Sequence, residues 1–148
     1  MSYTSLHYHI VFSTKERVAY LNQDLIPELR KYTAGIVRNH EGRLLNLNGP
    51  ENHVHLLAQL TPKMAIMDVV RHIKGNTSKW LSQKFPNLKA FSWQEGYSAF
   101  TVSQSGLPKV MCYIDDQIEH HKTMTFQEEL ISLLKKHRID YDERYIWL

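Results

Sequence analysis

Cysteine is almost absent from this 148-residue chain, whose single representative is Cys112. One cysteine excludes an internal disulfide and a zinc cluster built on thiolates, so any metal ligands must be histidine, carboxylate or amide side chains. The chain also lacks a run of about 18 consecutive apolar residues, the length that a membrane-spanning helix needs. Met1 to Ser13 lack the basic and apolar regions of a secretory signal. We therefore expect a cytoplasmic protein with no membrane partner.

The chain also lacks a large excess of charge of either sign. Lysine and arginine together number 18 against 15 aspartates and glutamates, which gives a net charge of +3. Phosphate binding depends on where basic residues lie rather than on their total, so this balance permits a nucleic-acid partner without requiring one. The length and the 43% of hydrophobic residues suit one hydrophobic core. We expect a single domain over residues 1–148, without repeats or linkers.

The hydrophobic pattern predicts alternating strands and helices. Alternation with a period of two predicts a first strand at 6–13. Two short strand-like runs on either side of Gly49-Pro50 predict a hairpin, at 43–48 and 53–60. Apolar residues at spacings of three and four predict helices at 22–40, 64–84, 109–121 and 126–136. Between the second and third helices, residues 91–103 are rich in aromatic and β-branched side chains and predict extended structure with a bulge.

This order predicts an α+β fold, the ferredoxin-like or RRM-like βαββαβ sandwich. Its antiparallel sheet carries helices on one face and leaves the other face free for a ligand, with further helices added at the C-terminal end. We expect the aromatic tail, residues 141–148, to dock on the rest of the chain. Of Trp93, Tyr97 and Phe100, we expect at least two to belong to the core rather than to a base-stacking surface.

The first group of residues with chemical potential is His53-Val54-His55. On a strand, residues two apart project from the same face, so both imidazoles can converge on one divalent cation while Val54 points into the core. Two partly exposed histidines on a sheet are the alternative, and a third ligand is needed to favour the metal.

The second group lies in the predicted helix at 109–121, where Tyr113 and Gln117 are four residues apart and so share one face. A tyrosine hydroxyl has a pKa near 10 and is a poor nucleophile. It can nevertheless attack a phosphodiester when a metal polarises the phosphorus. A ring that only caps the core is the alternative for Tyr113.

Taken together, these groups resemble the single-tyrosine HUH transposases of the smallest insertion sequences, the IS200-like transposases, with REP-associated tyrosine transposases as relatives. His53-Val54-His55 matches the histidine motif of that family, and 113–121 matches its helix with tyrosine, glutamine and paired histidines. The resemblance covers nearly the whole chain and extends to residues 8–15, 73–78, 93–100 and 141–147. One departure is Asn52, since the family commonly has aspartate before the first motif histidine.

The resemblance implies a DNA transposase that binds single-stranded DNA, often as a hairpin at the element's end. Cleavage would leave a free 3′-OH and a 5′-phosphotyrosine on Tyr113, with His53, His55 and Gln117 holding Mg²⁺ or Mn²⁺. It also implies a homodimer. A break at Gly106-Leu107-Pro108 would let the tyrosine helix reach the histidines of the partner subunit, a trans arrangement. The roles of His120 and His121 stay open.

Phosphate contacts are expected from basic residues in two places. The candidates are Lys15 and Arg17 in the loop after the first strand, and Arg71, Lys74 and Lys79 on the second helix. A solvated helix face would carry the same lysines. Two other functions also remain open, a non-catalytic RRM-like nucleic-acid-binding module and a metal-dependent phosphoesterase that uses water instead of Tyr113.

Overall fold

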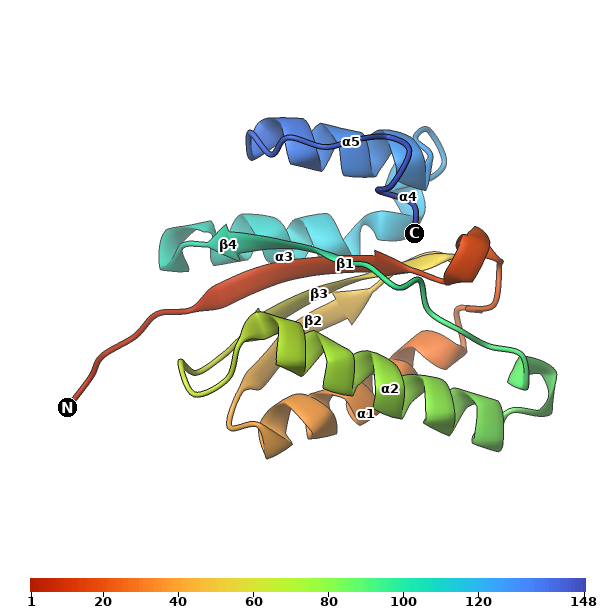
Figure 1. Cartoon of the computed structure of the whole chain (residues 1–148), viewed down its shortest axis with the longest axis horizontal. Helices are drawn as coiled ribbons and strands as arrows, with labels where there is room; N and C mark the ends of the chain where they lie inside the picture. The colour runs from red at the N-terminus through yellow and green to blue at the C-terminus, as the bar shows by residue number, and fades with distance from the viewer.

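The computed structural model describes all 148 residues and has a four-stranded antiparallel sheet at its centre (Figure 1). The strand order is β2-β3-β1-β4. The strands are β1 (His7–Ser13), β2 (Arg43–Asn48), β3 (His53–Gln59) and β4 (Ser98–Val102). Helices α1 (Leu25–Asn39) and α2 (Ile66–Lys84) connect the strands. This arrangement confirms the predicted βαββαβ sandwich and the hairpin of β2 and β3.

One face of the sheet packs against α1 and α2 (Figure 1). Successive strand residues point to opposite faces, and on β3 the residues that turn to this side are Val54, Leu56 and Ala58. Their partners are the apolar stripes of the two helices, which include Leu29 on α1 and Ile73 on α2. This is the larger of the two hydrophobic cores.

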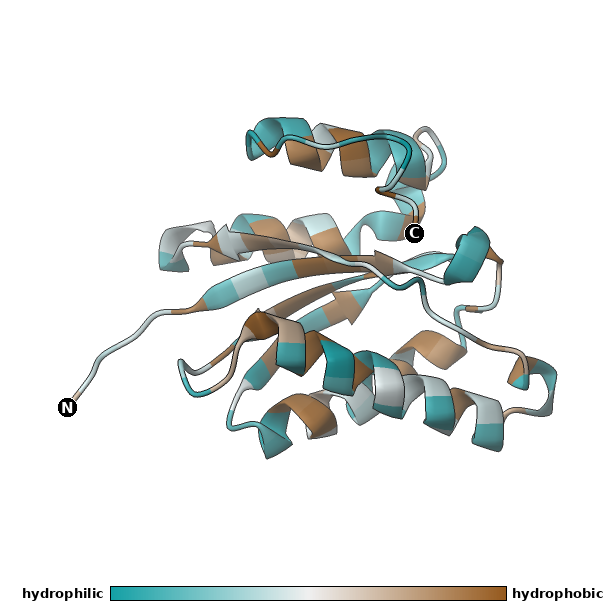
Figure 2. Cartoon of the chain, in the orientation of Figure 1, coloured by the Kyte–Doolittle hydropathy of each residue, from teal (hydrophilic) through white to brown (hydrophobic).

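The opposite face is covered by the C-terminal helices α3 (Leu107–Asp115), α4 (Gln117–His120) and α5 (Phe126–Lys136) (Figure 1). Our expectation that this face is free was wrong, because the apolar stripe of α5 needs a surface on which to be buried. Hydrophobic residues on the sheet-facing side of α5 are visible in Figure 2. They form a second, smaller core with two strand residues and with the tail, which docks as predicted. Its members are Val11, Phe100, Phe126, Leu130, Leu133 and Leu134, with Tyr141, Ile146 and Trp147 packed against them.

Two predicted elements differ in the structure. The helix expected at 109–121 is interrupted at Asp116, whose φ of −89° and ψ of 13° separate α3 from α4. In the segment expected to be extended at 91–103, only β4 is a regular strand, and Trp93 joins the sheet through a single bridge to Thr14. Trp93 and Phe100 are buried, which confirms the expectation that at least two of the three aromatic residues belong to the core.

Helix α3 is attached to the sheet mainly through polar groups. Its only fully buried residue is Ile114. Two side-chain amides of β2 hold its C-terminal end: Asn46 donates to Oδ1 of Asp115 at 2.9 Å, and Asn48 donates to the carbonyl of Ile114 at 3.0 Å. None of the helices in the structure combines the length and the hydrophobicity that crossing a bilayer requires.

Candidate active site

Strands β1 and β3 place three histidines under the C-terminal helices. Because Val54 points into the larger core, His53 and His55 point to the other face, where both are fully buried. Strand pairing places Val11 of β1 opposite His55. The neighbouring His9 lies with its Nε2 2.8 Å from Nδ1 of His55. This contact holds the His55 ring so that its other nitrogen, Nε2, points away from the sheet.

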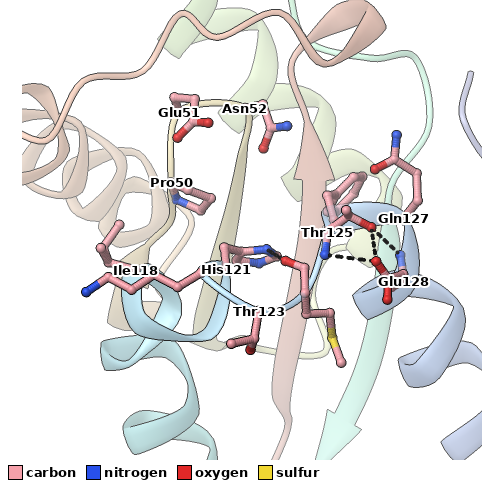
Figure 3. A pocket seen from close by; sticks show the side chains of 12 residues that line it. Pro50, Glu51, Asn52, Ile118, His121, Thr123, Thr125, Gln127 and Glu128 are labelled. Atoms are coloured by element: carbon pink, nitrogen blue, oxygen red, sulfur yellow. Dashed lines mark hydrogen bonds between the residues drawn. The ribbon is translucent and has the colours of Figure 1, made fainter.

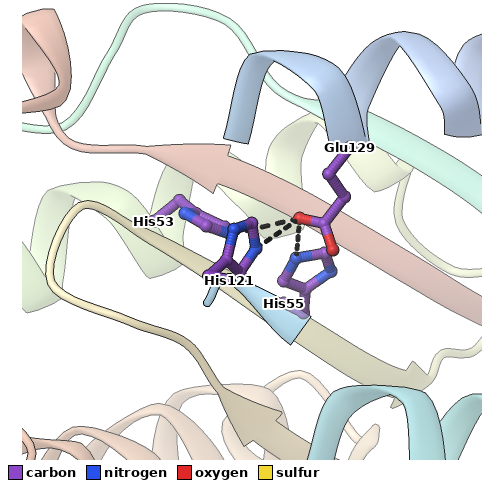
Figure 4. A group of neighbouring side chains, drawn as sticks. All are labelled: His53, His55, His121 and Glu129. Atoms are coloured by element: carbon purple, nitrogen blue, oxygen red, sulfur yellow. Dashed lines mark hydrogen bonds and ion pairs between the residues drawn. The ribbon is translucent and has the colours of Figure 1, made fainter. Parts of the chain in front are cut away.

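A buried carboxylate from α5 receives these imidazoles. Glu129 is 1% exposed, and its Oε1 lies 2.9 Å from Nε2 of His55, 3.0 Å from Nε2 of His121 and 3.2 Å from Nε2 of His53 (Figure 4). Burying a charged carboxylate is unfavourable unless other groups replace its water. The surrounding imidazoles provide this replacement, so the four side chains form one cluster built from three separate segments.

The second oxygen of the same carboxylate contacts the tyrosine and the glutamine singled out in the sequence. The Tyr113 hydroxyl donates to Oε2 of Glu129, and Nε2 of Gln117 donates to the same oxygen at 3.0 Å. The Gln117 side-chain oxygen lies 3.0 Å from Nε2 of His121. The four-residue spacing therefore keeps Tyr113 and Gln117 together despite the break at Asp116.

Burial and mutual contacts shift the pKa values of the cluster side chains and of their neighbours His9 and Tyr113. Burial lowers the pKa of His53 to about 4 and that of His9 to about 3. Burial also acts to lower the pKa of His121, but the hydrogen bond to Glu129, the Glu129 charge and the hydrogen bond to the Met124 carbonyl together outweigh it and raise that pKa. For Glu129 itself, hydrogen bonds from His121 and His55 and the close contact with His53 together overcome the effect of burial and hold its pKa well below the usual range. Burial and the Glu129 charge raise the pKa of Tyr113 above its usual value, so the phenol is protonated at neutral pH.

The residues of the cluster fit a divalent cation. One ligand atom from each of His53, His55, His121 and Glu129 lies within 4.8 Å of the others. Nε2 of His53 is buried and has no hydrogen-bond partner, since its 3.2 Å contact with Glu129 lacks hydrogen-bond geometry. Buried nitrogens without partners are rare, and a cation would satisfy this one. Imidazoles suit transition ions such as Mn²⁺, and the carboxylate suits both Mn²⁺ and Mg²⁺.

In both His53 and His55, the ring nitrogen that faces away from Glu129 has a hydrogen-bonding partner that fixes the orientation of the ring, as is usual for metal-binding imidazoles. Nδ1 of His53 lies 2.7 Å from the side-chain oxygen of Asn52, and His9 plays the equivalent part for His55. Asn52 thus offers a hydrogen-bonding oxygen without the negative charge of an aspartate.

An open polar hollow of about 570 Å³ adjoins the cluster, between the turn at Pro50-Glu51-Asn52 and the connection from α4 to α5 (Figure 3). His121 lies on its wall and is held there by the Met124 carbonyl, 2.7 Å from Nδ1. Since His121 also contacts Glu129, its side chain lies between the hollow and the buried carboxylate.

Comparison with known proteins identifies the family. The family model described as "Transposase IS200 like" matches residues 2–117, a span that includes the histidine pair, Tyr113 and Gln117. The chain belongs to the IS200-like transposase family. It is therefore a transposase, and the resemblance of its motifs to this family is confirmed.

Individual relatives of the transposase support its assignment to this family. The ISDra2 transposase TnpA of Deinococcus radiodurans is 27% identical over 117 residues, which are 76% of this chain and 84% of the relative. The transposase for insertion sequence element IS200 of Salmonella typhimurium is 31% identical over 124 residues, 78% of each chain.

Two solved structures resemble the transposase. The crystal structure of a putative transposase from Deinococcus radiodurans has a TM-score of 0.65 and 28% identity, covering 78% of this chain and 93% of that one. A REP-associated tyrosine transposase bound to a REP hairpin has a TM-score of 0.59 and 16% identity, covering 82% and 72% respectively, and is similar in fold.

The transposase brings some of the predicted site residues together and leaves others apart. The predicted ligands His53, His55 and Gln117 and the predicted nucleophile Tyr113 all contact Glu129. Their roles as ligands and nucleophile stay predictions. The contacts nevertheless show that residues from β3, α3, α4 and α5 form one site.

The predicted phosphate-binding residues are dispersed. Lys15 and Arg17 lie in a short 3-10 helix (Lys15–Arg17) directly after β1. Arg71 and Lys79 lie on α2, which packs on the sheet face opposite the cluster. Their contact with DNA stays a prediction.

Lys74 has a different environment from the other basic residues. Its ammonium donates to the carbonyls of Gln94 at 2.9 Å and of Glu95 at 3.1 Å, and also to the carbonyl of Gly96. Burial lowers its pKa to about 8. In this structure, Lys74 joins α2 to the loop before β4.

Sequence reasoning missed Glu129 and His9 and assigned no role to His121. Glu129 did give one signal: it lies three residues after Phe126 and four before Leu133, within the buried stripe of α5. A carboxylate on the apolar side of an amphipathic helix needs a polar partner in the fold. The matched family segment ends at residue 117, so Glu129 lies outside it.

Proposed function

We propose that this transposase is a metal-dependent single-stranded DNA endonuclease and strand-transferase, with Tyr113 as its nucleophile and residues 1–148 as one functional unit. The observation that supports this most is the convergence of the Tyr113 hydroxyl and the His53 and His55 imidazoles on the carboxylate of Glu129. A nucleophile and a metal-binding group then act on one phosphate.

The cleavage step transfers a phosphoryl group to tyrosine. The Tyr113 oxygen attacks phosphorus, the bond from phosphorus to the 3′ oxygen breaks, and the 5′ end stays attached as phosphotyrosine. Because the phenol is protonated at rest, its proton passes to Oε2 of Glu129, which already accepts its hydrogen bond, as the new bond to phosphorus forms, and Glu129 then releases it to water. The leaving 3′ oxygen takes a proton from water. A second 3′-OH can reverse this reaction and join new strands without ATP.

His53, His55 and Gln117 would hold Mg²⁺ or Mn²⁺, with Glu129 and His121 as further ligands from the same cluster. A divalent cation bound there supplies Lewis-acid activation of the phosphate and fixes its orientation. Its positive charge also opposes the effect of Glu129, which raises the pKa of the Tyr113 phenol.

The proposed substrate is single-stranded DNA that folds into a hairpin at the ends of the element. Membership of the transposase family supports a DNA partner, and one structure of similar fold is bound to a REP hairpin. Two element ends and one Tyr113 per chain favour a homodimer as the active form.

Trapping a covalent adduct tests the nucleophile. The chain is incubated with labelled single-stranded DNA from an element end and Mn²⁺, separated under denaturing conditions, and the labelled peptide is mapped. We expect an adduct on Tyr113 that Tyr113→Phe abolishes. Tyr32→Phe, which alters an exposed tyrosine on α1, is the control and should retain it. Cleavage without an adduct would favour a phosphoesterase that uses water, and binding without cleavage would favour a non-catalytic module.

Mixing two inactive variants tests the arrangement of the dimer. In the structure, the Tyr113 ring lies beside His55 of its own chain, with ring centroids 5.7 Å apart, which is a cis site. We propose that the active dimer uses the trans arrangement expected from the break before α3. Exchanging subunits between Tyr113→Phe and His53→Ala should then produce an adduct on the His53→Ala polypeptide. Failure to form it in a demonstrably exchanged mixture would establish the cis site.

A further inference from the structure

Tyr113 also lines a second groove, whose other lining residues come from β4, α3 and α5 and from the residues that adjoin them. This groove has a volume of about 280 Å³. Lys109 and Val110 line it from α3, Lys136 from the end of α5, and His137 from the residue that follows. The groove therefore connects the proposed nucleophile with two lysines that were not among the predicted phosphate contacts.

The charge of this groove has one sign. None of its lining residues is an aspartate or a glutamate. Lys109 and Lys136 are exposed, and neither forms an ion pair in the structure. The hollow beside His121 differs, because Glu51 and Glu128 line it. Unpaired ammonium groups close together attract phosphate groups and release their counterions.

The interior of the groove includes a stacked pair of rings and apolar side chains. The His137 ring stacks on Phe100 with centroids 4.3 Å apart and an angle of 25° between the planes. Its Nδ1 lies 2.9 Å from the Leu133 carbonyl, which fixes the ring, and Leu133 and Val110 supply apolar surface beside it. An apolar interior with a cationic rim matches a nucleotide, whose base is flat and whose phosphate is charged.

We infer that this groove binds a nucleotide of the DNA single strand next to the scissile phosphate, with Lys109 and Lys136 on its backbone phosphates. The inference rests on the proposed function, which places the scissile phosphate at Tyr113, and in the proposed trans dimer the same groove lies between α3 of one subunit and β4 and α5 of the other. Single-stranded DNA is the occupant because a base enters a groove of this size only when it is unpaired, whereas a duplex presents its backbone and hides its bases.

Binding measured in EDTA, where no cleavage occurs, tests the groove. The probe is a fluorescein-labelled oligothymidylate of about 12 nucleotides, with a blunt duplex of the same length for comparison. The test variant is Lys109→Ala with Lys136→Ala. The matched control is Lys31→Ala with Lys89→Ala, which removes two exposed lysines without ion pairs, one on α1 and one after Leu88.

We expect the test variant to bind the single strand roughly tenfold more weakly at low salt, and the slope of log affinity against log salt to fall by about 1.4. The control should stay within about twofold of the unaltered chain, and the duplex should lose less affinity than the single strand. Equal losses in both double variants, or an unchanged salt slope in the test variant, would overturn the inference.

A third variant, Val110→Trp, fills the groove without altering its charge and should weaken single-strand binding while the chain remains folded by circular dichroism. The adduct assay separates this inference from the proposed function. Normal adduct formation together with lysine variants that bind like the control contradicts the groove alone. A reduced salt slope without any adduct from the unaltered chain contradicts the proposed function alone.

Discussion

The two faces of the sheet are built from alternate residues of the same strands, yet they are stabilised in different ways. On β3, Val54 and Leu56 face α1 and α2, whereas His53 and His55 face the C-terminal helices. All four side chains are almost completely buried. Burial therefore does not distinguish a core from a site here. What distinguishes them is whether the buried atoms need partners.

The apolar face is stabilised by close packing alone, because its side-chain atoms need no hydrogen-bond partners. The polar face depends on Glu129, which replaces the water lost by the histidines, by Gln117 and by Tyr113. Among the side chains around Glu129, Nε2 of His53 is left without a hydrogen-bond partner. A buried group of this kind lowers stability, a cost that the metal ion proposed for this site would offset.

Replacing a residue on the polar face should have the largest effect. We expect His55→Ala to reduce adduct formation roughly a thousandfold or more, because several kcal/mol of transition-state stabilisation depend on the metal site. Excess EDTA should do the same to the unaltered chain, and Mn²⁺ should restore that chain only. Rates are measured by gel quantification of the adduct, with circular dichroism to verify folding. Undiminished cleavage in EDTA would contradict the metal-dependent reaction.

The adjacent residue on the apolar face should give the opposite result. Leu56→Ala removes a fully buried side chain from the larger core. We expect the free energy of unfolding to fall by about 2–5 kcal/mol in urea titrations. Adduct formation at a temperature where the variant stays folded should remain within a few-fold of normal. A loss of activity as large as that of His55→Ala would mean that the two faces are not functionally separate.

Acid should destabilise the polar face in metal-free buffer. The pKa of His9 is lowered to about 3 and that of His53 to about 4. Below pH 6.5, the unfolded state therefore binds more protons at these two side chains than the folded state does. Their stabilising contribution is therefore complete above pH 6.5 and is lost as the pH falls. Each contributes a loss of about 2 kcal/mol at about pH 5.

His121 acts in the opposite direction, because its pKa is raised and its contribution is lost as the pH rises. With two histidines against one, we expect the Tm to fall between about pH 7 and about pH 5. His9→Gln should reduce this fall. The measurement is thermal unfolding across the pH range, and an identical pH dependence in the variant would exclude His9 as a cause.

The smallest effect on stability is expected for Lys74, a charged side chain on α2, the helix that packs against the apolar face of the sheet. Lys74→Met removes the ammonium that three carbonyls share and should destabilise the chain by about 1–3 kcal/mol. Lys79→Met changes an exposed lysine on the same helix and should stay within about 0.5 kcal/mol of the unaltered chain. Urea titration compares them, and equal effects would show that the Lys74 contacts contribute nothing.

The local parts of this structure were predictable from the sequence. Alternation with a period of two identified the strands and placed His53 and His55 on the face opposite Val54. The four-residue spacing placed Gln117 beside Tyr113, even though Asp116 interrupts the helix. These features depend on neighbours in the sequence, for which spacing is sufficient.

Features that depend on distant segments were not predictable in the same way. The stripe of α5 showed that the helix must be buried but did not show on which surface, so the covering of the second face and the position of Glu129 were missed. The partners of Lys74 are backbone carbonyls, whose positions only the folded chain defines. Side-chain type carries no information about such partners.

Helix α3 carries the proposed nucleophile, yet amide hydrogen bonds from Asn46 and Asn48 and the single buried side chain of Ile114 form much of its attachment. Water can replace those hydrogen bonds, so local opening of this helix exposes little apolar surface and costs less free energy than global unfolding. Its backbone amides should accordingly exchange with deuterium sooner than those of α1 and α2. Detachment of the nucleophile is then a low-energy fluctuation of an otherwise intact native state.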